Sequence, residues 1–276
     1  MTCRRIGIVG GLGDLAGADL LFKFNRLASL EADGPAADVI LEQPRFADAR
    51  RGASGKDALG RRKLHVFEVV RALQKRDCDM ILLPCFLSHL YLDELREATG
   101  APILDMMQVL AEHLAEKHAS CHRIGVMTSP MIREAALFDR DLGRNGLKPV
   151  YNSADVAERQ LIPAIYGPEG IKAGRLVGAV LSDLRVARDE LVGDGCDALL
   201  SGFTELPLVG DALAADCPVP FLDCNAIYAE AALHSTVSVA APKHRIGVVG
   251  GVGPLATVDF MEKVIARTPA DRDQDH

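Results

Sequence analysis

The strongest constraint on the fold is an internal repeat with a spacing of 118 residues. The segment at residues 5–9 returns at residues 123–127, and several later segments match at the same spacing without gaps. Separated matches at one fixed spacing are typical of homologous structural units. The sequence therefore predicts two related halves, residues 1–118 and residues 119–238.

A third copy of the opening segment begins near the carboxyl end of the sequence. Residues 245–253 repeat residues 5–13 at a spacing of 240, and the correspondence continues to Asp259 and Lys263. We therefore expect residues 239–276 to form a linker and the start of a further repeat, as in a tandem protein.

Within each half, short apolar runs alternate with helical patterns. Residues 6–9 and 80–83 predict buried strands, whereas residues 15–30 and 88–98 predict helices. Buried strands separated by helices are typical of parallel sheets. We expect an α/β fold of two pseudo-symmetric doubly wound parallel-sheet domains with the site between them, beyond the carboxyl ends of the strands.

Composition excludes several classes of partner. The 276 residues include 31 Lys and Arg against 38 Asp and Glu, and a net charge of −7 disfavours a nucleic-acid partner. The apolar runs are too short to cross a membrane, so we expect no membrane contact. The 7 cysteines contain no Cys-x-x-Cys pair, which disfavours a disulfide framework and favours a cytoplasmic location.

A glycine-rich turn follows the first predicted strand. It contains Gly11-x-Gly13-x-x-Ala16, which matches the pattern of dinucleotide-binding turns and would indicate a nicotinamide-dependent dehydrogenase. The alternative is a tight strand-to-helix turn that brings backbone N–H groups close to a small anion. The second half lacks glycines at the corresponding positions, which favours the alternative.

Cys85 directly follows a predicted buried strand, at the edge where ligands bind in this fold class. It is either a packed thiol or a reactive one near a helix N-terminus. At the spacing of 118 its counterpart is Phe203. Three cations have two interpretations: they are solvated surface charges, or they bind the carboxylate of a ligand. They are Lys172, Arg50 and Arg51.

Several motifs together resemble the aspartate/glutamate racemase family, the cofactor-independent amino-acid racemases. The best match is Gly-Gly-Val-Gly-Pro-Leu-Ala-Thr at residues 250–257, and the first copy, which begins at Gly10, is a degraded version. The family's other motifs are retained at Pro84, Cys85, His89, Tyr166, Ile171, Lys172, Gly174, Thr204 and Glu205.

The resemblance implies that two opposed cysteines, one from each half, transfer a proton at Cα of an acidic amino acid without a cofactor. It implies that the ligand is a small amino acid or carboxylate, and it makes a homodimer possible. The catalytic positions it implies are Cys85 and Phe203, the latter in the place of the second thiol. The substrate-binding positions it implies are Leu12, Arg50, Phe86, Leu87, Lys172, Thr204 and Glu205, and no metal ligand is implied.

Phe203 departs from the family pattern because a phenyl ring cannot donate or accept a proton. Phe86 and Leu87 also replace polar family residues, and we expect their bulk to fill part of the pocket. Three hypotheses remain open. The chain is a racemase-type enzyme with Cys85 as its only thiol, a catalytically degenerate ligand-binding or regulatory unit, or a single-thiol decarboxylase-like enzyme.

Overall fold

A computed structural model describes most of the chain. The described residues are 4–30, 37–46 and 56–235, together with residues 259 and 263. The chain divides into two compact units, Met1–Val239 and Ala240–His276, and the architecture given below is that of the first. Arg50, Arg51 and nearly all of the predicted third repeat lie outside the described residues.

The first half contains a three-stranded parallel sheet in the order β2-β1-β3. Its strands are β1 (Arg4–Val9), β2 (Ala37–Glu42) and β3 (Met80–Leu82). The central strand pairs Ile6 with Val39 on one side and with Met80 on the other. A single parallel bridge between Ile81 and Ile103 extends the sheet beyond β3.

The second half contains a four-stranded parallel sheet in the order β5-β4-β6-β7. Its strands are β4 (Arg123–Met127), β5 (Lys148–Tyr151), β6 (Ala198–Ser201) and β7 (Phe221–Leu222). The edge strand β7 begins at Phe221, which follows Ile103 by the repeat spacing of 118. The two sheets therefore have the same strand order, and the predicted parallel α/β fold is confirmed.

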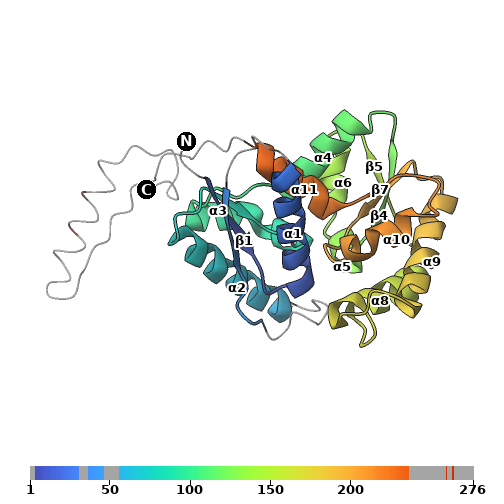
Figure 1. Ribbon diagram of the computed structural model, residues 1–276, viewed down its shortest axis with the longest axis horizontal. Coiled ribbons are helices and arrows are strands. Elements are labelled where there is room, and N and C mark those ends of the chain that lie inside the picture. Colours follow the sequence, from blue (N-terminus) through green and yellow to red (C-terminus); the bar gives the residue numbers. More distant parts are fainter. Residues whose placement is uncertain (1–3, 31–36, 47–55, 236–258, 260–262, 264–276) are drawn as a thin grey trace. The chain divides into compact units, whose positions relative to one another are not determined.

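Helices cover both faces of each sheet (Figure 1). Those of the first half are α1 (Asp14–Leu30), α2 (Lys56–Gln74), η1 (Phe86–Tyr91), α3 (Leu92–Thr99) and α4 (Met106–Lys117). Those of the second half are α5 (Pro130–Glu134), α6 (Leu137–Gly143), α7 (Ala154–Val156), η2 (Ala157–Leu161), α8 (Ile162–Tyr166), η3 (Ile171–Ala173), α9 (Ala179–Gly193), η4 (Leu206–Val209), α10 (Gly210–Ala214) and α11 (Cys224–His234).

One hydrophobic core joins the two halves. It includes Ile6 and Ile8 from β1 together with Ile124 and Val126 from β4, all fully buried. The opposite face of each sheet packs on its own helices, such as α2 in the first half and α9 in the second. The two halves are therefore held together by apolar burial, which stabilises roughly in proportion to the area removed from water.

The last helix of the second half reaches across to the first half. In the sequence α11 is the final described helix, yet it packs along α1 and α4, as Figure 1 shows. Its Tyr228 is fully buried; the hydroxyl donates to the Leu104 carbonyl at 2.7 Å and accepts from the Leu83 backbone N–H at 3.2 Å. This side chain therefore fixes the backbone at Leu83, just after β3 and shortly before Cys85.

The segment that follows Cys85 differs from the single helix predicted over residues 88–98. It begins as the 3₁₀ helix η1 and continues as α3, because the chain turns tightly after β3, where the Cys85 N–H donates to the Leu83 carbonyl at 2.8 Å. The helix ends where predicted, at Gly100, which has a φ of 63°. No helix in the described part of the chain is long and apolar enough to cross a membrane.

Candidate active site

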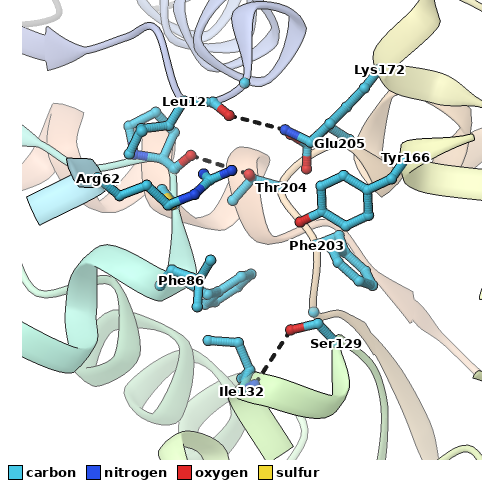
Figure 2. A pocket seen from close by; sticks show the side chains of 15 residues that line it. Leu12, Arg62, Phe86, Ser129, Ile132, Tyr166, Lys172, Phe203, Thr204 and Glu205 are labelled. Carbon is cyan, nitrogen blue, oxygen red and sulfur yellow. Dashed lines mark hydrogen bonds and ion pairs between the residues drawn. The ribbon is translucent and has the colours of Figure 1, made fainter. Parts of the chain in front are cut away.

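A small cavity lies at the carboxyl ends of β1, β3, β4 and β6, where both halves contribute side chains (Figure 2). Its lining residues are Leu12, Gly13, Arg62, Pro84, Cys85, Phe86, Leu87, Ser129, Ile132, Tyr166, Lys172, Gly202, Phe203, Thr204 and Glu205. Its volume of about 30 Å³ has room for one or two water molecules. In this conformation the cavity is too small for an amino acid.

Cys85 enters the cavity from the first half. It precedes η1 with an extended backbone (φ −162°, ψ 110°), and its side chain is half-buried. The other described cysteines do not line the cavity, and burial raises the pKa of the Cys78, Cys121, Cys196 and Cys224 thiols. Cys85 is therefore the one thiol at the cavity among the described residues.

Phe203 enters the same cavity from the second half, after β6. Its side chain is 6% exposed and its ring meets the Tyr166 ring edge-on, with 6.0 Å between the ring centroids. The symmetry that relates Cys85 to Phe203 in sequence is thus also present in space, since both residues line one cavity. A thiol on one side of the cavity therefore lies opposite an aromatic ring on the other.

Lys172 and Glu205 form a buried ion pair at the cavity wall, with side chains 7% and 5% exposed. The Lys172 ammonium also donates to the Leu12 carbonyl at 3.0 Å. A Cβ at Gly13 would lie 2.3 Å from Glu205 Oε1, so only glycine leaves room for the pair. The glycine-rich turn of the first half is therefore shaped by contact with the second half, which accounts for Gly13 without a dinucleotide.

Thr204 lies at the base of the cavity and connects the halves. Its hydroxyl donates to the Pro84 carbonyl at 3.1 Å, and its own carbonyl accepts from Asn225 Nδ2 at 2.9 Å. Asn225 also donates to Asp19 at 2.7 Å, and Asp19 pairs with Lys23 at 2.6 Å. This buried polar network holds the backbone on either side of Cys85 and Phe203.

One wall of the cavity is apolar. Phe86, Leu87 and Ile132 line it, and the Phe86 ring packs on Phe138 with 5.1 Å between centroids. Figure 2 shows Phe86 and Ile132 below the Lys172–Glu205 pair, so the cavity has a polar side and an apolar side. The expected filling of the pocket by Phe86 and Leu87 agrees with its small volume.

Arg62 also lines the cavity, although none of the sequence motifs indicated it. Arg62 comes from α2, is 3% exposed, and its guanidinium lies 5.6 Å from the Phe46 ring centroid. Figure 2 shows the guanidinium extending toward Thr204. A signal was present, because Arg62 precedes the buried Val66 and Val69 by four and seven residues and so falls on the apolar face of its helix.

His89, which the family resemblance singled out, does not reach the cavity. His89 is 3% exposed and packs beside β3, where Nε2 lies 3.2 Å from the Leu83 carbonyl. Burial lowers the pKa of His89, although the Asp105 carboxylate opposes that shift. Within the described ranges no group of His, Cys, Asp or Glu could hold a metal ion.

A family model described as Asp/Glu/Hydantoin racemase matches residues 9–232. The chain belongs to this family. The match covers both halves and every residue that lines the cavity.

Individual relatives in the Asp/Glu/hydantoin racemase family are distant. A broad-specificity amino-acid racemase, RacX, from Bacillus subtilis is 26% identical over 167 residues, which span 60% of this chain and 66% of that protein. The crystal structure of an aspartate racemase homologue from Pyrococcus horikoshii superimposes with a TM-score of 0.65 at 17% identity, covering 82% of this chain and 96% of that one.

A glutamate racemase from Francisella tularensis, solved with D-glutamate, gives a TM-score of 0.61 at 14% identity, covering 96% of this chain and 84% of that one. At these identities the solved structures show a shared fold, whereas membership of the racemase family comes from the family model.

Proposed function

We propose that this chain transfers a proton at Cα of a small amino acid, without pyridoxal phosphate, and that Cys85 is the group that moves the proton. The observation that carries the proposal is the position of Cys85, which is the only thiol at the cavity among the described residues and lies opposite Phe203. Acidic amino acids are the first substrates to test, because the chain belongs to a family named for them.

The polar wall of the cavity suits the ends of an amino acid. Arg62 and Lys172 bring positive charge for a carboxylate, and the Glu205 carboxylate can accept hydrogen bonds from an ammonium group. Positive charge beside the carboxylate would stabilise the carbanion that forms when the Cα proton leaves. The Cys85 thiolate would take that proton, since thiolates are effective bases when positioned at a substrate.

A second candidate function is ligand binding without catalysis, and the small cavity favours it. A volume of about 30 Å³ requires Phe86, Leu87 or Phe203 to move before an amino acid can enter. A family member that had lost catalysis could keep this scaffold and act as a regulatory unit. Binding without exchange is the result that would identify such a role.

The deciding experiment is exchange of the Cα proton in D₂O, followed by NMR, with L- and D-aspartate and L- and D-glutamate and then the other amino acids. The proposal predicts exchange of at least one enantiomer. It also predicts that Cys85→Ser lowers the exchange rate by about 100-fold or more, as for removal of a general base.

The matched control is Cys217→Ser, because Cys217 is a half-buried free thiol that does not line the cavity. This variant is expected to exchange at the wild-type rate. Exchange that persists in Cys85→Ser would overturn the assignment of Cys85. The absence of exchange with every amino acid, together with saturable binding of one of them, would replace the proposal with the ligand-binding function.

A further inference from the structure

The Tyr166 hydroxyl faces the cavity beside Phe203. Tyr166 is the last residue of α8, and its ring meets Phe203 at an interplanar angle of 75°. Figure 2 shows the ring next to Phe203 with its hydroxyl directed into the cavity. An O–H group from the second half thus stands near the place where the counterpart of Cys85 would be.

The surroundings of Tyr166 keep its ring in place and its hydroxyl neutral. The Lys172 ammonium lies 5.4 Å from the ring centroid, and Phe203 packs against the ring edge. Burial raises the pKa of Tyr166, the Glu205 carboxylate raises it further, and the Arg62 guanidinium opposes the shift. At neutral pH the phenol is therefore protonated and available as a donor.

We propose that Tyr166 is the second proton-transfer group of this site, acting on the face of the substrate opposite Cys85. The inference rests on the proposed function, since it needs Cys85 to move the Cα proton. With Tyr166 as a second proton-transfer group, a site that has a single thiol can invert a stereocentre. The substrate class is then a chiral amino acid that is released with inverted configuration.

The proposed inversion has two proton transfers and a return step. The Cys85 thiolate removes the Cα proton, so an S–H bond forms and the C–H electron pair moves into the carboxylate-stabilised carbanion. The Tyr166 O–H then protonates the other face, which forms the new C–H bond and leaves a tyrosinate. The Cys85 thiol returns its proton to the tyrosinate through water, and nothing is oxidised or reduced.

The two directions of this reaction begin from different protonation states. One enantiomer reacts with the thiolate and the neutral phenol, and the other reacts with the thiol and the tyrosinate. A phenol in this environment is a weaker acid than an ordinary tyrosine, so the first state is the more populated. We therefore expect exchange on the Cys85 side to be faster than exchange on the Tyr166 side.

The test compares Tyr166→Phe with wild type in two assays, Cα exchange in D₂O by NMR and inversion by chiral chromatography. The variant keeps the ring that packs on Phe203 and removes only the hydroxyl. We expect inversion to fall by about 100-fold or more, whereas exchange of the enantiomer that Cys85 deprotonates stays within a few-fold of wild type. The matched control is Tyr151→Phe. Tyr151 does not line this cavity, and its hydroxyl donates to the Asp139 carboxylate at 2.6 Å.

The possible outcomes distinguish a failure of the role of Tyr166 from a failure of the role of Cys85. Exchange without inversion in the wild type would overturn the role of Tyr166 and leave that of Cys85 standing. Inversion that persists in Tyr166→Phe would overturn the role of Tyr166 as well, and equal losses of inversion and exchange would indicate that Tyr166 only positions the substrate. Exchange unaffected by Cys85→Ser would remove the basis of both proposals.

Discussion

The two halves of this protein share their supporting residues and differ at the residues that line the cavity. Asp79 and Asp197, 118 residues apart, each accept a backbone N–H at the start of the central strand of their sheet, from Arg5 at 2.7 Å and from Arg123 at 2.8 Å. At the cavity the first half has Cys85-Phe86-Leu87, whereas the second has Phe203-Thr204-Glu205.

The two halves keep the same residue where the packing is tight and differ where they line the cavity. Gly7 and Gly125 correspond at the same spacing, and each faces a leucine and a cysteine so closely that a Cβ would meet them within about 3 Å. Close side-chain packing of this kind favours glycine at both positions. At residues 85–87 and 203–205 the two halves differ, and the cavity has a thiol and apolar groups from the first half against an aromatic ring and polar groups from the second.

The largest effect is expected from Phe203→Cys, which would remove the main difference between the halves. A thiol opposite Cys85 should raise the inversion rate by about 100-fold, the usual range for one added acid or base group. Loss of the buried ring should destabilise the fold by about 2–4 kcal/mol. Chiral chromatography measures the first change and urea denaturation the second.

If Tyr166 supplies the second proton in the wild type, adding Tyr166→Phe to Phe203→Cys should leave the gained inversion largely intact. An inversion rate that does not change in Phe203→Cys would show that the geometry opposite Cys85 cannot support a second thiol.

A smaller effect is expected from Gly13→Ala, which disturbs the contact between the halves. The new Cβ would lie 2.3 Å from Glu205 Oε1 and 3.1 Å from Lys172 Nζ, so the buried pair must move. We expect a loss of about 1–3 kcal/mol in the free energy of unfolding. Gly60→Ala is the control, because nothing lies within 4 Å of its Cβ position and alanine favours the helix. Equal stability of the two variants would contradict the packing role of Gly13.

Tyr228→Phe tests how α11 supports the first half from the second. The change leaves the Leu83 N–H and the Leu104 carbonyl without the hydroxyl that bonds both. A buried polar group that loses its partner costs about 1–3 kcal/mol, and we expect a loss in that range by thermal or urea denaturation. Stability equal to wild type would mean that other groups satisfy the end of β3.

The smallest effect is expected from Asp197→Asn, compared with Asp79→Asn in the first half. Backbone N–H groups of Arg123 and His122 donate to Asp197 at 2.8 and 2.7 Å and lower the pKa of its carboxyl. A lowered pKa stabilises the fold above the unfolded value of about 3.9, and this contribution is lost as the pH falls through the folded value.

Wild type should therefore exceed Asp197→Asn in stability at pH 7, with a difference that shrinks below about pH 4. Asp79→Asn should cost less, since Asp79 accepts a backbone N–H from Arg5 alone among the contacts resolved for it. A difference that grows on acidification would contradict this account.

The order of strands and helices follows from the sequence because apolar periodicity and a repeat at a fixed spacing can both be recognised without knowing any contact. The runs at β1, β3, β4 and β6 are apolar, and the spacing of 118 aligns the two sheets before any contact is known. Cys85 and Phe203 could also be paired from the sequence, since the repeat makes them counterparts. The rule that parallel strands end at a common edge places each residue at the carboxyl edge of its own sheet. Their meeting in one cavity depends on how the two sheets pack together.

The sequence by itself determined the parallel α/β fold, and its repeat predicted two related halves and offered Cys85 and Phe203 as candidates. Tertiary structure decided what surrounds them: Arg62 enters the cavity from a distant helix, Tyr166 turns its hydroxyl beside Phe203, and Gly13 accommodates an ion pair from the other half. Periodicity identifies which face of an element is buried, but not which residue of another element meets it. That pairing depends on how the halves pack together, and packing is a property of the whole chain.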